Sequence, residues 1–241
     1  MTEGFNLNAL DREFYADPFP TYARLRQSQP VYQPEPGQVY LFRYDHIRDV
    51  YRDAHTFSSD KKAQFGPAFG VDSPLYAHHT TSLVFNDPPL HTQARRAIGN
   101  ALSQRMLVAM REGLEAVVDD LLQHMSPADE VDLISNFAAA IPIEIIGNLL
   151  RIPDNERGPL RRWSLAILGA LEVALDPNIT DEGNRAVEEF VAYLEDLVTR
   201  RRQALTDDED DILARLIRWQ HNGVGLTPHE LYHQCIFLLN A

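Results

Sequence analysis

The residues most suited to chemistry lie in one short run, from Asn86 to Arg96. Asp87 can cap a helix that two prolines open, and His91 and Arg95 then lie four residues apart on one face. Their donor groups lie where the helix dipole is already positive, and the local sequence offers them no acidic partner. A bound carboxylate or phosphate would satisfy both groups. The spacing leaves an alternative open, namely a solvated surface pair or ion pairs with distant Asp or Glu side chains.

The cysteine content limits the chemistry further. The single cysteine, Cys235, cannot form an internal disulfide and cannot build a cysteine-rich zinc site. Its neighbours Gln234 and Ile236 continue a helical pattern, so we expect Cys235 to be a small core residue and not a metal ligand. A single cysteine is also typical of a reducing compartment, and the sequence therefore predicts a cytoplasmic protein.

Charge and hydropathy argue against two classes of partner. The net charge of -13 and the pI near 5.0 do not suit a surface that binds the phosphate backbone of nucleic acid. No stretch approaches the roughly 18 consecutive apolar residues that a membrane span needs. We therefore expect no nucleic-acid partner and no membrane span.

The elements that must position the reactive groups are mostly helices. Two short extended runs at 31–33 and 39–42 flank a Pro-Glu-Pro-Gly turn and predict a β-hairpin. Residues 57–85 lose any period and predict a long irregular loop that contacts substrate. Beyond it, apolar stripes at helical spacing predict three core-facing helices, at 114–122, 141–150 and 187–198.

The last helix begins with a clear signal and lacks a matching end. Thr227, Pro228 and Glu230 form a capping-box pattern that predicts its start. The apolar pattern then continues to Ala241 without a glycine or a basic last turn. We therefore expect residues 1–241 to form a single, incomplete domain.

The run around His91 carries a resemblance to a known family. The pattern Asp-Pro-Pro-x-His-Thr-x-x-Arg-Arg resembles the helix C motif of soluble bacterial cytochrome P450 monooxygenases. The resemblance implies that His91 and Arg95 bind the haem propionates. The commoner form of the motif has Arg and Leu where Gln93 and Ala94 stand here, a departure that leaves the two haem-facing positions intact.

Further segments are similar to the same family in the same order along the chain. They lie at 17–26, 42–59, 131–153 and 210–231. The resemblance implies a mainly α fold, the N-terminal portion of the P450 fold from helix A to the start of helix I, with a small β-hairpin near the N-terminus.

The same resemblance implies a function for the full-length protein. It would insert one oxygen atom of O2 into a small, apolar organic substrate, with two electrons from a ferredoxin or flavodoxin-type donor. The cofactor would be haem b with an axial cysteine thiolate. The implied cofactor-binding residues are His91, Arg95 and Ala241, and the implied substrate-pocket residues are Val84, Ile167, Leu171, Phe237 and Asn240.

The sequence departs from the family where the chemistry is centred. In the family a segment like 237–241 is followed by Gly, an acidic residue and Thr, and much later by a Phe-x-x-Gly loop with the ligating cysteine; these 241 residues contain neither. We therefore predict no catalytic residue in this fragment and no activity of the fragment alone. The alternative is a truncated, non-catalytic helical binding or interaction remnant.

Overall fold

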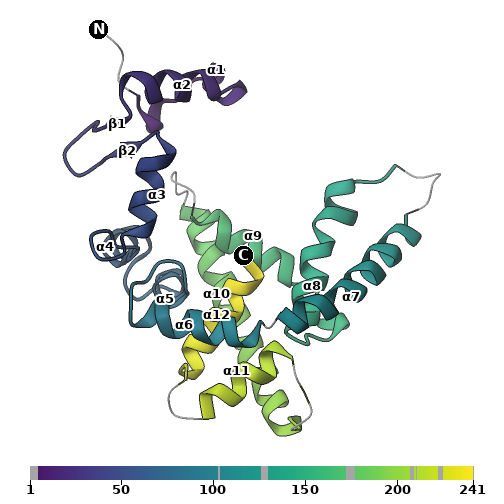
Figure 1. Ribbon diagram of the computed structural model, residues 1–241. Coiled ribbons are helices and arrows are strands. Elements are labelled where there is room, and N and C mark those ends of the chain that lie inside the picture. The colour runs from purple at the N-terminus through teal and green to yellow at the C-terminus, as the bar shows by residue number, and fades with distance from the viewer. Residues whose placement is uncertain are drawn as a thin grey trace. The chain divides into compact units, whose positions relative to one another are not determined.

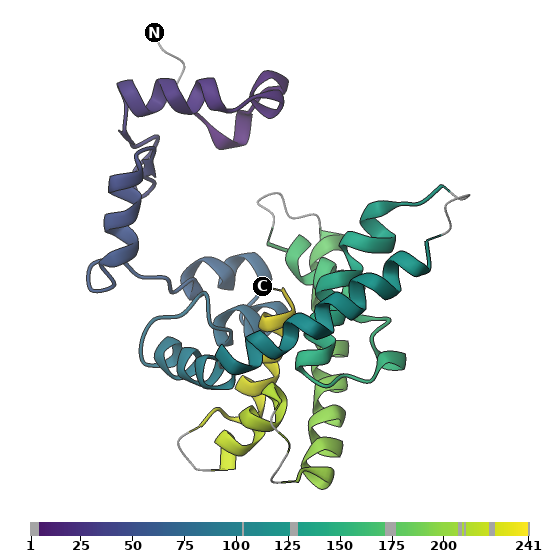
Figure 2. The same cartoon turned by 45° about the vertical axis from the view of Figure 1, so that its right-hand side comes forward.

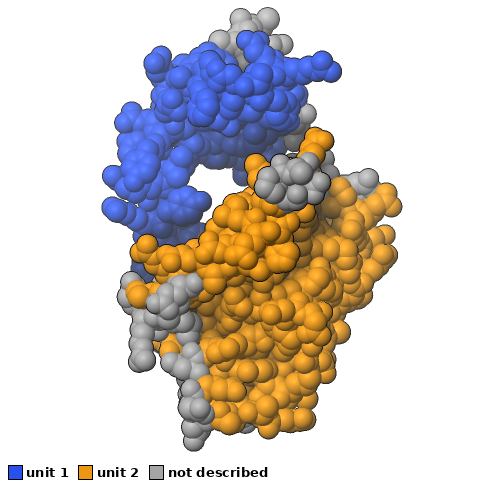
Figure 3. All heavy atoms as spheres, turned by 90° about the vertical axis from the view of Figure 1, so that its right-hand side faces the viewer, with its two compact units in different colours: residues 1–58 blue, residues 59–241 orange. Residues whose placement is uncertain are grey.

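The computed structural model describes residues 5–102, 104–125, 130–171, 177–206, 209, 211–221 and 225–240. Contacts divide the chain into two compact units, residues 1–58 and residues 59–241, which Figure 3 colours separately. That they belong to one incomplete domain stays a prediction.

The first unit contains the predicted β-hairpin. Strands β1 (Val31–Tyr32) and β2 (Tyr40–Leu41) pair antiparallel, with Val31 opposite Leu41. The ring of Phe5 packs edge-on against the rings of Tyr40 and Phe42. The helices of this unit are η1 (Leu7–Ala9), α1 (Arg12–Ala16), α2 (Phe19–Ser28) and α3 (Tyr44–Arg52).

The regular elements of the second unit, among its described residues, are all helices (Figure 1). Its helices are α4 (Lys62–Phe69), α5 (Pro74–Thr81), α6 (Leu90–Ala101), α7 (Gln104–Gln123), η2 (Ile134–Ala138), α8 (Ala140–Leu149), η3 (Asp154–Glu156), α9 (Leu160–Gly169), α10 (Pro177–Ala204), α11 (Ile212–His221) and α12 (Pro228–Asn240). The mainly α fold with one small hairpin is therefore confirmed.

The core of this unit forms around α10 and α12. α12 lies against α5, α8, α9 and α10, and Figure 2 shows it among them. The apolar stripe of α10 is buried as predicted, with Phe190 stacked on Trp163 of α9 at 4.9 Å between ring centroids. α12 begins with the predicted capping box, since Thr227 Oγ1 accepts from the Glu230 N–H and the Glu230 carboxylate accepts from the Thr227 N–H.

The prediction of an irregular loop over residues 57–85 was wrong, because α4 and α5 form there. The Ser73 hydroxyl accepts from the Tyr76 N–H, and Pro74 occupies the first turn of α5. α4 lacks a clear apolar period and is held by tertiary packing, since its Phe65 and Phe69 rings pack against His79 of α5.

The stripe at 114–122 does not form core among the described residues. Leu114 and Leu122 are exposed, and α7 packs mainly against α8 and η2. The stripe of α8 is half-buried, and Ile143, Ile146 and Leu149 pack against the main core. An apolar period therefore predicted the helices here but not the depth of their burial.

Candidate functional site

Helix α6 presents the predicted donor groups on its outer face. Ala94, Ala97 and Ile98 are buried, whereas Arg95 and Arg96 are exposed and His91 is half-buried. Within the part of the chain that the structure describes, no hydrogen bond or ion pair engages the side chains of these two arginines or of His91. That His91 and Arg95 bind an anion at the start of α6 stays a prediction.

The start of α6 differs from the prediction in one respect. The helix begins at Leu90 after a cis bond between Pro88 and Pro89, and no side chain caps it. The main-chain carbonyl of Asp87 accepts from the His91 N–H, and its carboxylate accepts from the Ser59 N–H, with 2.9 Å between the carboxylate oxygen and the Ser59 nitrogen. The bond to Ser59 ties the residues before α4 to the residues before α6.

Phe237 joins α12 to α6. Its side chain packs with Leu83, Ala94 and Ile98, a small apolar cluster that includes two buried residues of α6. Val84, next to Leu83, is 48% exposed. The structure thus brings Phe237 and the residues next to Val84 to the same helix that carries His91 and Arg95.

Asn240 is held from α9. The Ser164 hydroxyl donates to the Asn240 side-chain oxygen, with 2.5 Å between the two oxygens. Ile167, one turn further along α9, is fully buried in the main core, and Leu171 is half-buried. Ala241 lies outside the described residues. The pocket roles of all these residues stay predictions.

Cys235 lies on α12, fully buried in the main core. Burial raises the pKa of its thiol to about 12, so it stays protonated at neutral pH. Both observations support the prediction that Cys235 is not a metal ligand.

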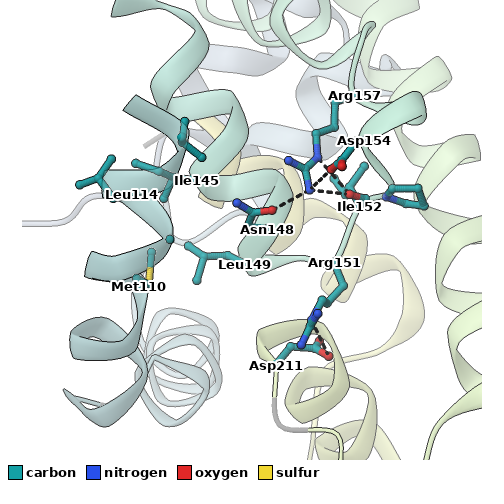
Figure 4. Close-up of a pocket in the computed structure, with 13 residues that line it drawn as sticks. Met110, Leu114, Ile145, Asn148, Leu149, Arg151, Ile152, Asp154, Arg157 and Asp211 are labelled. Atoms are coloured by element: carbon teal, nitrogen blue, oxygen red, sulfur yellow. Dashed lines mark hydrogen bonds and ion pairs between the residues drawn. The ribbon is translucent and has the colours of Figure 1, made fainter. Parts of the chain in front are cut away.

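A pocket of about 570 Å³ opens elsewhere, between α7, α8 and the loop at 150–154 (Figure 4). None of the predicted site residues lines it. Arg157 lies at its wall and donates to the Asn148 side chain, to the Ile152 carbonyl and to Asp154, while Arg151 faces Asp211 at 3.9 Å. The charged side chains at the pocket wall pair with one another, Arg157 with Asp154 and Arg151 with Asp211. None of them therefore points to a bound ligand.

A histidine cluster was overlooked at the sequence level. His78 and His79 of α5 lie beside His233 of α12, and His229 lies one turn before His233. Residues 229–233 read His-Glu-Leu-Tyr-His, and this His-Glu-x-x-His pattern was the signal that could have drawn attention to them.

Neither a membrane-spanning helix nor a metal-binding cluster is present among the described residues. No helix there is long and apolar enough to cross a membrane. No group of three or more His, Cys, Asp or Glu side chains there is placed to hold a metal ion.

Comparison with known proteins gives a consistent set of relatives, although no family model matches the sequence. The chain is 33% identical over 240 residues to 6-deoxyerythronolide B hydroxylase of Saccharopolyspora erythraea. The match covers 95% of this chain and 57% of that protein. It is 31% identical over 243 residues to the cytochrome P450 monooxygenase PikC of Streptomyces venezuelae, with coverage of 98% and 55%. The chain thus spans a little over half the length of these curated relatives.

Solved structures agree with the sequence matches. CalO2 superimposes with a TM-score of 0.83 at 23% identity, covering 98% of this chain and 58% of that one. Cytochrome P450 TbtJ1 superimposes with a TM-score of 0.78 at 28% identity, covering 98% and 57%. The helical arrangement and the sequence matches lead to the same conclusion: the chain belongs to the cytochrome P450 family.

Proposed function

We propose that this chain is the N-terminal part of a haem-dependent monooxygenase that hydroxylates a small, apolar organic substrate with O2 and two electrons from a ferredoxin or flavodoxin-type donor. The observation that carries the proposal is the pair of unengaged donors, His91 and Arg95, on α6 of a chain related to bacterial P450 monooxygenases. The single cysteine supports a place in the cytosol.

The residues present fit haem b at α6. Haem b carries two propionates, and the start of α6 offers an imidazole and a guanidinium that no described group engages. His91 and Arg95 would hold the propionates, and the bound haem would supply the activation of O2. The chain's own share of the work is to hold the cofactor, to orient the substrate and to exclude water.

The apolar side chains beside α6 fit the last two tasks. Phe237 would present its ring to the substrate and Val84 would close over it, while Ser164 would keep Asn240 in one orientation. Relatives named as a 6-deoxyerythronolide B hydroxylase and a vitamin D(3) 25-hydroxylase suggest a largely apolar substrate for this protein too. Ile167 is enclosed by core residues, so its contribution would be to shape the pocket wall.

The 241 residues alone are expected to give no spectrum of thiolate-ligated haem. Their one thiol, on Cys235, is buried and protonated, so it cannot supply the axial ligand. The measurement is a reduced carbon monoxide difference spectrum of this chain beside that of the longest open reading frame of its gene. A thiolate-type Soret band from the chain alone, or none from a longer frame that contains further cysteines, would contradict the proposal.

Replacing Arg95 with Ala is expected to speed haem loss by about tenfold, because one charge-assisted hydrogen bond to a propionate disappears. Arg96→Ala is the matched control, since Arg96 is the next residue, is also exposed and also lacks a described partner. The rate of haem transfer to an excess of apomyoglobin, measured in the protein from the longest open frame, compares the two. Equal rates for both variants would remove the propionate role of Arg95.

A further inference from the structure

The feature with no role in the proposed function is the histidine cluster between α5 and α12. His78, His79 and His233 are 3%, 2% and 1% exposed, whereas His229 is exposed at the start of α12. Two contacts link three of the rings: His78 Nδ1 lies 3.3 Å from His233 Nδ1, and His233 Nε2 lies 3.1 Å from His229 Nε2. A line of imidazoles thus runs from the surface into the interface of the two helices.

Neutral imidazoles satisfy both contacts of this line. A neutral imidazole carries one N–H donor and one acceptor nitrogen, so each contact can pair one donor with one acceptor, in either direction along the line. Protonated His233 would donate from both nitrogens, and it would then need both partners to accept. Protonation of His78 as well would place two donors 3.3 Å apart at the helix interface.

The groups around the three buried histidines lower their pKa values. Burial, then the neighbouring His79 and His233, lowers the pKa of His78 well below its usual value. Burial lowers the pKa of His79 to about 4, and burial with His229 and His79 lowers the pKa of His233 to about 3. No carboxylate is among the groups that act on these three described histidines.

The neighbouring helices contribute neutral contacts to α5. α4 supplies the rings of Phe65 and Phe69 against His79, and α10 supplies Asn184, whose side chain accepts from the Leu75 N–H. His79 Nε2 is buried without a hydrogen-bond partner among the described residues. A proton on any of the three rings would therefore be buried without a counter-charge.

Zinc chemistry fits the His-Glu-x-x-His pattern poorly. In zinc peptidases the glutamate of this pattern acts as a base. Here the Glu230 carboxylate accepts from both the N–H and the hydroxyl of Thr227 as a helix cap. Among the described residues no third ligand joins the two histidines. Glu230 of this pattern therefore caps the helix, and His229 and His233 belong to the line of imidazoles.

The two ends of α5 are held in different ways. Its first turn is anchored to α10, where Leu75 is fully buried and Gly183 allows a close approach: a Cβ at Gly183 would lie 3.0 Å from the Leu75 side chain. Its last turn is held on α12 by His78 and by the Gln234 side chain, which donates to the Thr81 carbonyl. Acid would weaken only the second attachment.

We propose that the His78–His233 contact is a pH-sensitive latch, which holds the last turn of α5 on α12 at neutral pH and releases it in acid. Release would free the segment that leads through Leu83 and Val84 to α6. Its consequence for substrate access rests on the proposed function, but the latch itself does not.

Amide hydrogen exchange of the full chain, corrected for the intrinsic effect of pH, tests the latch. In the open state the imidazoles regain an ordinary pKa near 6.5, so a shift from about pH 7.5 to about pH 5.5 favours opening by about tenfold for each ring exposed. Opening of residues 78–86 exposes His79 as well as His78 and His233, so we expect a rise of about a thousandfold for the three rings together. Residues 187–198 of α10 should respond far less. The measurement needs no haem, so its failure would leave the proposed function untouched.

Variants separate the latch from general acid sensitivity. His78→Gln and His233→Gln keep a hydrogen-bonding side chain without a titrating ring, and each should remove about one tenfold step of the response. His124→Gln, at an exposed histidine just after the end of α7, should leave the response unchanged. The proposal is overturned if residues 78–86 show no pH response, if α10 opens in parallel with them, or if either Gln variant keeps the full response.

Discussion

A fall in pH from about 7 to about 5 is expected to lower the free energy of unfolding by about 4 kcal/mol, about 2 kcal/mol from each of two buried histidines. Burial lowers the pKa of His79 to about 4 and that of His233 to about 3, whereas both titrate near 6.5 when the chain unfolds. His78 acts in the same direction.

The direction of the effect follows from proton uptake. Below pH 6.5 the unfolded chain binds protons at these rings and the folded chain does not, so stability is lost as the pH falls from 6.5 toward the folded-state values. Carboxylates with lowered pKa values, such as Glu156 beside Arg200, lose their contribution only at lower pH. The window between about pH 7 and about pH 5 therefore reports mainly on histidines.

Urea unfolding at a series of pH values measures the effect, and His79→Leu tests its source. The His79 Nε2 atom has no described partner, so Leu removes a titrating group from an aromatic environment without breaking a hydrogen bond of that atom. The variant should lose about 2 kcal/mol of the pH dependence, the share of one buried histidine. A His79→Leu curve parallel to that of the wild type would show that the stability loss has another origin.

Local signals in the sequence predicted the elements well where the signal and its partner lie close together. The capping box of Thr227 and Glu230 spans one turn, and both of its hydrogen bonds form. The hairpin is set by a turn between two short strands, and it pairs as expected. The stripe of α10 was long and regular enough to predict its burial.

Signals failed where the partner is distant in sequence. Asp87 reads as a helix cap, but its carboxylate accepts from Ser59, 28 residues earlier. α4 contains Gly66 and Pro67, which argue against a helix, and the contacts of its phenylalanines with His79 outweigh them. Packing between elements decided each case.

The candidate site shows the same division. Spacing alone predicted that His91 and Arg95 share one face of a helix, and the resemblance predicted a ligand for that face. Neither could reveal that Ser164 holds Asn240 or that His78 meets His233, because these pairs lie 76 and 155 residues apart. A pattern of a few residues reports on one helix, and a site between helices needs the fold.

Replacing Arg157 with Met is expected to destabilise the chain by about 3 kcal/mol, because several acceptors lose their donor inside the fold. The Arg157 side chain is 8% exposed and donates to the Ile152 carbonyl, to Asn148 and to Glu144. It also packs over Gly147, where a Cβ would lie 2.5 Å from its Nε atom. Met fills part of the volume but leaves the carbonyl and the amide unpaired.

A surface pair of the same chemistry provides the control. Arg162 donates to Glu189 at 2.6 Å, but its side chain is 54% exposed, so Arg162→Met should cost less than about 1 kcal/mol. Arg157→Lys should lie between the two, since it keeps the charge but lacks the planar guanidinium that reaches several acceptors. Chemical denaturation at neutral pH ranks the three variants. If Arg157→Met were as mild as Arg162→Met, water would have to satisfy the acceptors around Arg157, and the loop from Arg151 to Arg157 would owe its conformation to chain packing alone.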